Sequence, residues 1–415
     1  MMTADSQTWR DKGDALLPYL LCTTAVLLPF SIAASNVLLG LSLVIAIITG
    51  CWWRGLKSLF HKAKTFSVIF LAYFALMLIG LLWSPDVARG AIIVSKQWSW
   101  LLLPLVMITL DNKLWRDRFL FFLSIGLGLH LLLCLAQSFG VPLPVQAPAG
   151  SSSDDPTGLI GRIGFGLLYG MWGAWLIQWG WQRKDGWRYL AWVTAGLAFT
   201  MIFMAQGRSG YLVAFAVLIL MAWKLWLDRL DWQLLLSAAA VIAIIVTVIA
   251  LGPAKERLQW TADSINAVYH GDFQNAEARW SLWYAAWKGW QDNPVLGVGT
   301  GGFPITAQNI ASSKPDLFFG GPSPAHPHQM YLLDLVRWGP VGLLLLIMFL
   351  WQWFRLGIRT DWSRENYSSL VALSAIGMAV HGISAPSLEE YYSSVYATLF
   401  LATGLAAINR DEEHE

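Results

Sequence analysis

Runs of apolar residues alternate with short polar segments along almost the whole chain. A membrane-spanning helix needs about 20 consecutive apolar residues, and each of these runs approaches or reaches that length. The runs lie at residues 16–34, 35–52, 66–83, 97–110, 117–139, 161–181, 187–205, 209–227, 233–251, 329–353, 367–385 and 391–408. The pattern predicts an all-α polytopic integral membrane protein with about 12 transmembrane helices.

Two features of this pattern set the predicted domain organisation. Residues 1–15 are polar, and no small-residue cleavage site follows the first apolar run, so we predict an uncleaved first span rather than a signal peptide. One long segment, 252–328, separates the ninth run from the tenth. We therefore expect helices 1–9 within residues 1–251, a large loop with short helices over 252–328, and helices 10–12 with a short tail over 329–415.

Composition supports a membrane protein and argues against other classes. Hydrophobic residues make up 56% of the 415 positions and charged residues only 13%, whereas an average soluble domain is about 25% charged. The net charge of +2 indicates no nucleic-acid partner. Cys22, Cys51 and Cys134 lie in apolar runs without metal-ligand spacing, so we interpret them as small hydrophobic residues of the membrane interior.

The distribution of lysine and arginine predicts the orientation of the chain. Cytoplasmic loops of membrane proteins carry an excess of both residues. If the N-terminus lies inside, every cytoplasmic loop between spans is basic, and these loops together with the termini hold most of the 28 lysines and arginines. The outer segment 140–160, a proline-, glycine- and serine-rich stretch, holds none. We therefore predict that both termini are cytoplasmic and that the 252–328 loop lies outside.

Basic residues that break this pattern are the first candidates for function, because an unpaired charge beside a span costs free energy. They are Arg89, Lys96, Arg162, Arg208, Lys255, Arg257, Arg279, Lys288, Lys314 and Arg337. Those at the outer end of an apolar run, or beside tryptophan-rich sequence, are Arg89, Lys96, Arg162, Arg208 and Arg279. If they converge at one depth they would bind an anion, because arginine is a permanently charged, bidentate ligand of phosphate.

Arg208 and Arg279 each have two interpretations. Arg208 lies in a very short turn between two apolar runs, where it is either an anion ligand or a side chain that snorkels to the membrane surface. The helix that Arg279 opens has one face formed by Trp280, Trp283, Trp287 and Trp290. A tryptophan face belongs at headgroup height, so this helix either only anchors the loop or also holds Arg279 near lipid phosphate.

His326 and His328 flank Pro327 just before the tenth apolar run. A metal site is one interpretation, but two histidines are too few ligands and no acidic residue or cysteine lies nearby on the predicted outer side. A general base is the better chemical interpretation for His328, because imidazole titrates near neutral pH. An interfacial histidine without a chemical role is the other alternative.

Three segments together resemble one family of bacterial envelope enzymes. They are Gln206-Gly207-Arg208-Ser209-Gly210, then Arg279 with Pro294-Val295-Leu296-Gly297-Val298-Gly299, then His328-Gln329-Met330-Tyr331-Leu332. Their order and spacing are similar to those of the O-antigen ligase and O-antigen polymerase superfamily. The resemblance covers roughly residues 160–350 in motifs and the whole chain in topology, and it implies about a dozen spans with one large periplasmic loop.

The resemblance also implies roles for individual residues. Arg208 and Arg279 match the arginines that the superfamily requires, and His328 matches its histidine. His328 fits better than His326 because the family's histidine is followed by a polar residue, most often asparagine, and Gln329 takes that place here. Three further basic residues match no motif: Arg89, Lys96 and Arg162. We assign them to lipid diphosphate binding because of their charge and their position in the chain.

The function that the resemblance implies is glycosyl transfer at the periplasmic face of the bacterial inner membrane. The donor would be an undecaprenyl diphosphate-linked glycan and the acceptor a sugar of a lipid A–core, with membrane lipids as further partners. Arginines would stabilise the diphosphate leaving group, and His328 would take the proton of the acceptor hydroxyl. We therefore expect an inverting transfer without a metal or other cofactor.

Alternatives remain within and outside the superfamily. The short charged tail after the last apolar run favours an O-antigen ligase, since protein O-oligosaccharyltransferases usually have a longer extension, whereas a polymerase is of similar size. Outside the superfamily, a lipid-diphosphate transporter would also bind the donor. The sequence lacks an evident inverted repeat, and its candidate basic residues lie at outer ends of spans rather than at mid-membrane, which argues against transport.

The predicted orientation can be tested by labelling. In a background without the native cysteines, single cysteines near positions 270 and 310 should react with a membrane-impermeant reagent from outside. Cysteines near positions 60 and 360 should react only after the membrane is permeabilised. Labelling of position 270 from the cytoplasmic side would contradict the orientation.

Overall fold

The computed structural model describes residues 9–143, 148, 151–226, 254–274, 276–317, 325–360, 362 and 367–408. Over these residues the secondary structure is helical, apart from one isolated bridge between Ser152 and Asp155. The predicted all-α class is confirmed.

The helices of the N-terminal half are α1 (Trp9–Leu27), α2 (Ile32–Thr49), α3 (Cys51–Lys62), α4 (Lys64–Ile79), α5 (Val87–Ser95), the 3₁₀ helix η1 (Lys96–Leu101), α6 (Leu102–Thr109), α7 (Lys113–Ser138), α8 (Arg162–Gln182), α9 (Trp187–Met204) and α10 (Arg208–Trp226). The segment predicted as the large loop contains α12 (Ala254–Tyr269), α13 (Ala278–Asp292) and α14 (Phe303–Ser313). The chain then forms α15 (Met330–Ile358), α16 (Ser368–His381) and α17 (Tyr391–Ala407).

Several helices are long and apolar enough to cross a membrane. Five described helices meet that requirement, and a sixth is added if the bent pair α3 and α4 counts as one span. They are Ile32–Thr49, Val87–Thr109, Lys113–Ser138, Trp187–Met204 and Met330–Ile358. The protein is therefore a polytopic membrane protein, whereas the count of about 12 spans stays a prediction, and its ninth span, 233–251, lies outside the described residues.

Two predicted spans differ clearly from the helices observed. The first, predicted at 16–34, corresponds to α1 at Trp9–Leu27, and the fourth differs more. The run at 97–110 is only the second half of a continuous helical segment, Val87–Thr109, made of α5, η1 and α6. Asp86 caps its start, since its side chain accepts a hydrogen bond from the N–H of Arg89 at 2.8 Å. Arg89 and Lys96 break the apolar pattern of the first three turns, so hydrophobicity alone places the start of this span too late.

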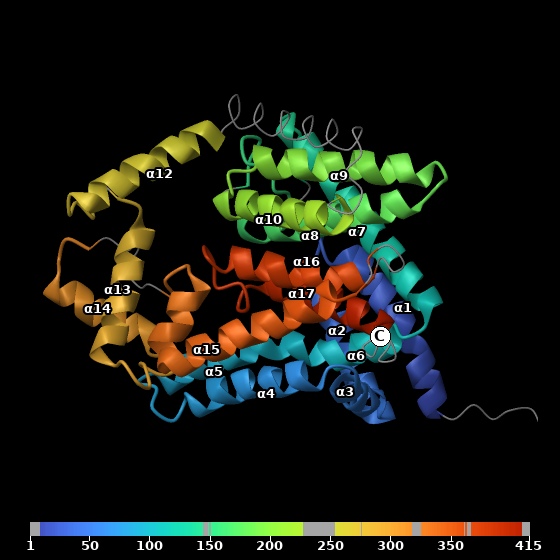
Figure 1. The fold of residues 1–415 in the computed structure, drawn as a ribbon, viewed down its shortest axis with the longest axis horizontal. Helices are drawn as coiled ribbons and strands as arrows, with labels where there is room; N and C mark the ends of the chain where they lie inside the picture. The colour runs from blue at the N-terminus through green and yellow to red at the C-terminus, as the bar shows by residue number, and fades with distance from the viewer. Residues whose placement is uncertain are drawn as a thin grey trace, which may run out of the picture.

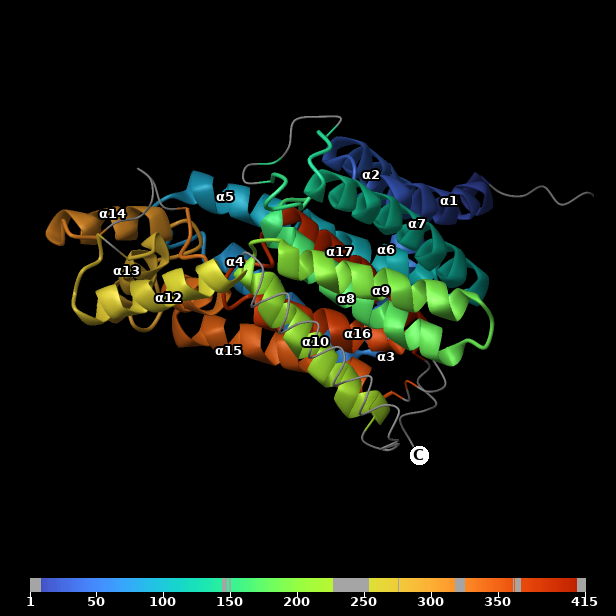
Figure 2. The same cartoon turned by 90° about the horizontal axis from the view of Figure 1, so that it is seen from above.

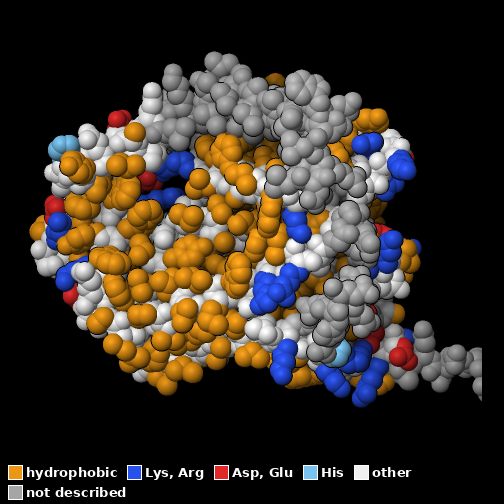
Figure 3. Space-filling view, in the orientation of Figure 1, with side chains coloured by type: hydrophobic (Ala, Val, Ile, Leu, Met, Phe, Trp, Pro, Cys, Tyr) orange, Lys and Arg blue, Asp and Glu red, His pale blue; other side chains and the backbone are white. Residues whose placement is uncertain are grey.

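The outer surface of the bundle is apolar, as a lipid-facing surface must be. Large hydrophobic side chains of the candidate spans stay exposed, among them Val37 of α2, Val193 of α9 and Leu344 of α15. Figure 3 shows hydrophobic side chains covering much of one face of the molecule. The interior instead holds many small and hydroxyl-bearing residues, including Ser42, Ser374 and Thr403, whose hydroxyls donate to backbone carbonyls of their own helices.

The loop helices lie together at one end of the bundle. Figures 1 and 2 both show α12, α13 and α14 grouped beyond one end of the long helices. Helix α13 packs against α14 and α15, and α16 contacts α8, α10, α15 and α17. The loop therefore covers the end of the bundle at which α8, α10 and α15 begin.

Helix α15 is broken in its middle, and a loop segment fills the break. Gly339 has a φ of 65°, outside the helical region, and Pro340 lacks the N–H that would bond to the carbonyl of Val336. The N–H of Val298 donates to that carbonyl instead, at 2.8 Å. The loop thus satisfies a buried polar group that the break exposes.

The loop segment that fills the break is residues 294–299, with the pattern Pro-x-Leu-Gly-x-Gly. Its glycines allow the close approach to α15. The N–H of Gly299 donates to the carbonyl of Arg337 at 2.8 Å. A Cβ on Gly297 would lie 2.5 Å from the carbonyl carbon of Arg337, and one on Gly339 would lie 2.1 Å from the carbonyl oxygen of Val295. All three glycines also have a positive φ, which disfavours any other residue.

The residue after this segment, Thr300, bonds to the C-terminal end of α4. Thr300 donates through its N–H to the carbonyl of Gly80 at 3.1 Å and through Oγ1 to the carbonyl of Met77 at 2.7 Å. The indole of Trp338 donates to Thr300 Oγ1 at 3.0 Å. The loop therefore joins α4 to the first half of α15.

Alanine at Gly339 or Gly297 should destabilise the protein strongly. A Cβ would overlap backbone atoms that cannot move without opening the junction, and we expect each change to cost at least about 1–3 kcal/mol. Gly40→Ala is the matched control, because a Cβ there meets no atom within 4 Å. Thermal unfolding in detergent measures the effect, and equal midpoints for Gly339→Ala and Gly40→Ala would contradict it.

Candidate functional site

The predicted site residues all lie near helix starts. Arg208 begins α10, Arg162 begins α8 and Arg279 is the second residue of α13. Arg89 lies in the first turn of α5 and Lys96 begins η1. His328 lies two residues before the start of α15.

Arg208 is held by two elements of the large loop. Its Nη1 donates to Thr261 Oγ1 at 2.6 Å and its Nη2 to Glu277 Oε1 at 2.5 Å. Its guanidinium lies 5.4 Å from the centre of the Trp260 ring. The start of α10 and the loop helix α12 are therefore joined through this side chain, which explains why a charge stands in so short a turn.

Arg279 shares the same carboxylate. Its Nε lies 3.3 Å from Glu277 Oε1, the oxygen that also pairs with Arg208. Burial lowers the pKa of Arg279, Glu277 opposes this, and the charge of Arg208 lowers the pKa further. The two arginines therefore converge on one carboxylate oxygen.

Glu277 is the residue that sequence reasoning missed. Its side chain is only 16% exposed, and its N–H donates to Ser264 Oγ of α12 at 2.7 Å. It precedes α13 in a polar stretch that no periodic pattern singles out. A single carboxylate facing two arginines leaves the cluster with an excess of positive charge.

His328 lies beside this cluster. It is the only residue other than glycine with a positive φ, 52°, in the described part of the chain, which is uncommon and costs backbone energy. The pKa of His328 is lowered, first by burial and then by Arg279, with Glu277 opposing. Its imidazole is therefore neutral at neutral pH, which is the form that accepts a proton.

His326 is the immediate neighbour of His328. The two ring centres are 4.4 Å apart, and the N–H of His328 donates to Nδ1 of His326 at 3.3 Å. Burial lowers the pKa of His326 to about 3, with further contributions from His328, Arg337, Lys96 and Arg89. Arg89 and Lys96 are therefore close enough to His326 for their positive charges to lower its pKa.

The two histidines sit in a fixed loop. The carbonyl of Pro327 accepts a hydrogen bond from Trp283 Nε1 of α13 at 2.9 Å, and the side chain of Gln329 caps α15 by accepting from the N–H of Leu332. The buried face of α13 is formed by other residues than its tryptophans, and Trp287 is 46% exposed. The helix thus positions the histidine loop as well as Arg279.

Arg162 and Arg337 have protein partners. Arg162 pairs with the buried carboxylate of Asp155 at 2.7 Å, and Asp155 also accepts from the N–H of Gln206 at 3.0 Å. Arg162 is therefore linked to the turn that precedes Arg208. Arg337, 1% exposed, forms an ion pair with Glu389, so its departure from the predicted charge pattern has a structural reason.

Arg89 and Lys96 differ from these. Among the described residues neither side chain has a hydrogen bond or ion pair, and both contribute positive charge near His326. In the same part of the chain no group of three or more His, Cys, Asp and Glu side chains is arranged to hold a metal ion. The cluster is thus cationic, with two neutral histidines beside it.

Fold and site together define an all-α integral membrane protein with a cationic, histidine-bearing cluster under a large loop at one end of its bundle. Residues 193–347 match the sequence model of the family described as O-antigen ligase. This range contains Arg208, Glu277, Arg279 and both histidines, so the match supports the resemblance to the O-antigen ligase superfamily that the sequence motifs indicated. No curated protein matches the chain closely enough to count as a relative.

Removing the Glu277 carboxylate should loosen the cluster. Glu277→Gln leaves two guanidinium groups without their shared counter-ion, and we expect the thermal midpoint in detergent to fall by about 2–4 °C. Inorganic pyrophosphate should raise the midpoint of the variant more than that of the unmodified protein, because it replaces the lost negative charge. Asp292→Asn, at an exposed ion pair with Lys288, is the control and should show neither effect. An unchanged midpoint for Glu277→Gln would contradict the shared role of its carboxylate.

Proposed function

We propose that this protein is a glycosyltransferase that moves a glycan from an undecaprenyl diphosphate to a sugar of a lipid A–core, as an O-antigen ligase does. The observation that supports this most is the convergence of Arg208 and Arg279 on one oxygen atom, with His328 close enough to Arg279 and Glu277 for their charges to act on it. The family match over residues 193–347 supports the general class of reaction. Donor, acceptor and residue roles belong to the proposal.

In the proposed reaction the arginines bind the donor diphosphate. The acceptor hydroxyl oxygen attacks the anomeric carbon from the face opposite the diphosphate, so the configuration inverts. The bond between that carbon and the diphosphate oxygen breaks, and the electron pair leaves with undecaprenyl diphosphate. Arg208 and Arg279 stabilise the charge that develops on this leaving group, and they do so without needing a metal.

His328 is the proposed general base. Its neutral imidazole accepts the proton of the acceptor hydroxyl as the new glycosidic bond forms. General-base assistance of this kind contributes about 10²–10⁴-fold to a rate. Burial, and after it the neighbouring positive charge of Arg279, lowers the pKa of His328 and so favours the neutral imidazole.

The remaining basic residues have supporting roles in the proposal. Arg89 and Lys96 attract the anionic donor toward the histidine side of the cluster. Arg162, through Asp155, holds the turn that presents Arg208, and contributes charge rather than a direct phosphate contact. We place the site at the periplasmic face of a bacterial inner membrane, with both termini cytoplasmic.

Two other members of the superfamily carry out similar transfers, namely the O-antigen polymerase and the protein O-oligosaccharyltransferase. One assay distinguishes them from a ligase. Purified protein and a lipid-linked glycan donor are supplied with a defined lipid A–core, with a lipid-linked repeat unit or with a protein acceptor. We expect product only with the lipid A–core, whereas donor binding without any product would favour a lipid-diphosphate transporter.

Arg208→Ala and Arg279→Ala should each abolish transfer while the protein still inserts. Lysine at either position should restore little activity, because a single ammonium group does not replace the two parallel hydrogen bonds of a guanidinium. We expect losses of at least about 10²-fold, measured as kcat/KM for the donor. Near-normal rates for both lysine variants would mean that these residues only anchor the loop.

His328→Ala should remove turnover but leave donor binding intact, because the base contacts the acceptor rather than the diphosphate. His326→Ala should reduce activity less. In the unmodified protein, kcat/KM should be constant at neutral pH and fall at acidic pH, with a midpoint below about 6.5, because the lowered pKa of His328 keeps the base unprotonated until then. Full activity of His328→Ala, or loss of donor binding alone, would contradict the assignment.

A further inference from the structure

A second basic site lies on the side of the protein that the charge distribution predicts to be cytoplasmic. Helices α3 and α4 meet there at a bend of 118° around Ala63. The last turns of α15 lie opposite this bend, and the two enclose a pocket with a volume of about 200 Å³. The residues that line it are His61, Lys62, Ala63, Lys64, Thr65, Phe66, Gln352, Arg355, Leu356 and Arg359.

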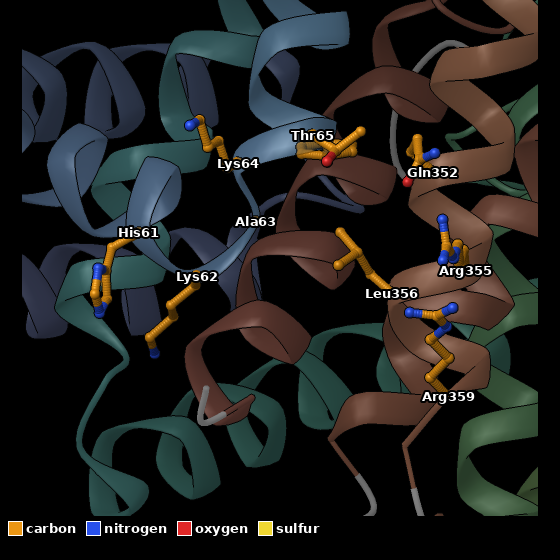
Figure 4. A pocket seen from close by; sticks show the side chains of 10 residues that line it. His61, Lys62, Ala63, Lys64, Thr65, Gln352, Arg355, Leu356 and Arg359 are labelled. Atoms are coloured by element: carbon orange, nitrogen blue, oxygen red, sulfur yellow. The ribbon is translucent and has the colours of Figure 1, made fainter. Parts of the chain in front are cut away.

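The pocket is lined by basic side chains and by no acidic one. Figure 4 shows Gln352, Arg355 and Arg359 along α15 on one side, and the residues of the α3–α4 bend on the other. Lys62 is already paired, since its Nζ lies 3.1 Å from Asp111 Oδ1. Within the described ranges, Lys64, Arg355 and Arg359 have neither an ion pair nor a side-chain hydrogen bond, so positive charge accumulates in one pocket without a described counter-ion.

The surroundings of the pocket are apolar. Phe66 and Leu356 form part of its wall, and the neighbouring faces of α4 and α15 expose Val68 and Leu71, and Met348 and Trp351. Figure 3 shows lysine and arginine side chains gathered at the edge of a broad hydrophobic surface. A ligand of this pocket therefore needs a phosphate-like anion and an apolar part beside it.

We propose that the pocket between the α3–α4 bend and the end of α15 binds the phosphate headgroup of an anionic phospholipid, with its acyl chains along the exposed faces of α4 and α15. Arg355 and Arg359 are one helical turn apart and can both donate to one phosphate. Lys64, at the first turn of α4, lies on the other side of the pocket and adds to its positive charge, although Figure 4 shows its side chain directed away from the two arginines. This site is separate from the cluster of Arg208, Arg279 and His328, and its occupancy does not depend on glycosyl transfer.

Native mass spectrometry of the full-length protein in a neutral detergent tests the proposal. Phosphatidylglycerol is titrated against the protein, with phosphatidylcholine as the uncharged lipid. The pocket variant is Arg355→Gln with Arg359→Gln, and the matched control is Lys113→Gln with Lys184→Gln, which removes two exposed basic residues outside the pocket. We expect the pocket variant to bind phosphatidylglycerol about 10-fold more weakly, and the control to bind like the unmodified protein.

Further arms separate the possible sources of phosphate. Inorganic phosphate and glycerol phosphate should raise the thermal midpoint far less than phosphatidylglycerol does, because they lack the acyl chains. Arg359→Gln alone, at an exposed position, should weaken lipid binding about threefold and covers the case in which the double variant fails to fold. Equal lipid affinity in the pocket and control variants, or equal stabilisation by inorganic phosphate and the lipid, would overturn the proposal.

Discussion

The broken helix α15 is the constraint on which the rest of this structure depends. Pro340 removes the intrahelical partner of the Val336 carbonyl, and a buried carbonyl without a partner is costly. The Pro-x-Leu-Gly-x-Gly segment satisfies it from outside the helix, and in doing so fixes the end of the loop against the bundle. The histidine loop precedes α15, and α13 precedes this segment, so one junction sets where both parts of the candidate site can lie.

The basic residues at the two ends of the bundle differ in whether they have acidic partners among the described residues. In the candidate site, Glu277 holds Arg208 and Arg279 together, so the arginines are oriented before any substrate arrives. Pre-oriented donors lose less freedom when they bind a diphosphate, which suits a site that works by electrostatic stabilisation. At the other end, Arg355 and Arg359 have no described acidic partner, and we assign them to lipid binding.

Part of the site could be predicted because each residue carries its own signal. Arg208 and Arg279 are basic residues in segments that the lysine and arginine distribution assigns to the outside. His328 follows a proline at the start of a span. Glu277 and Asp155 carry no such signal, since an acidic residue in an outer loop is ordinary until a fold brings arginines to it. The start of the span at Val87 was missed for a related reason, because Arg89 and Lys96 interrupt its hydrophobic pattern.

The sequence by itself determined that this protein is an α-helical membrane protein and that its motifs resemble those of the O-antigen ligase superfamily, because hydrophobic length and motifs are local properties of the chain. It also indicated which basic residues needed an explanation. Only the tertiary structure decided that Arg208 and Arg279 share Glu277, that Arg162 and Arg337 pair with Asp155 and Glu389, and that a loop fills the break in α15. These contacts join residues far apart in the chain, and their partners are chosen by packing, which no local pattern encodes.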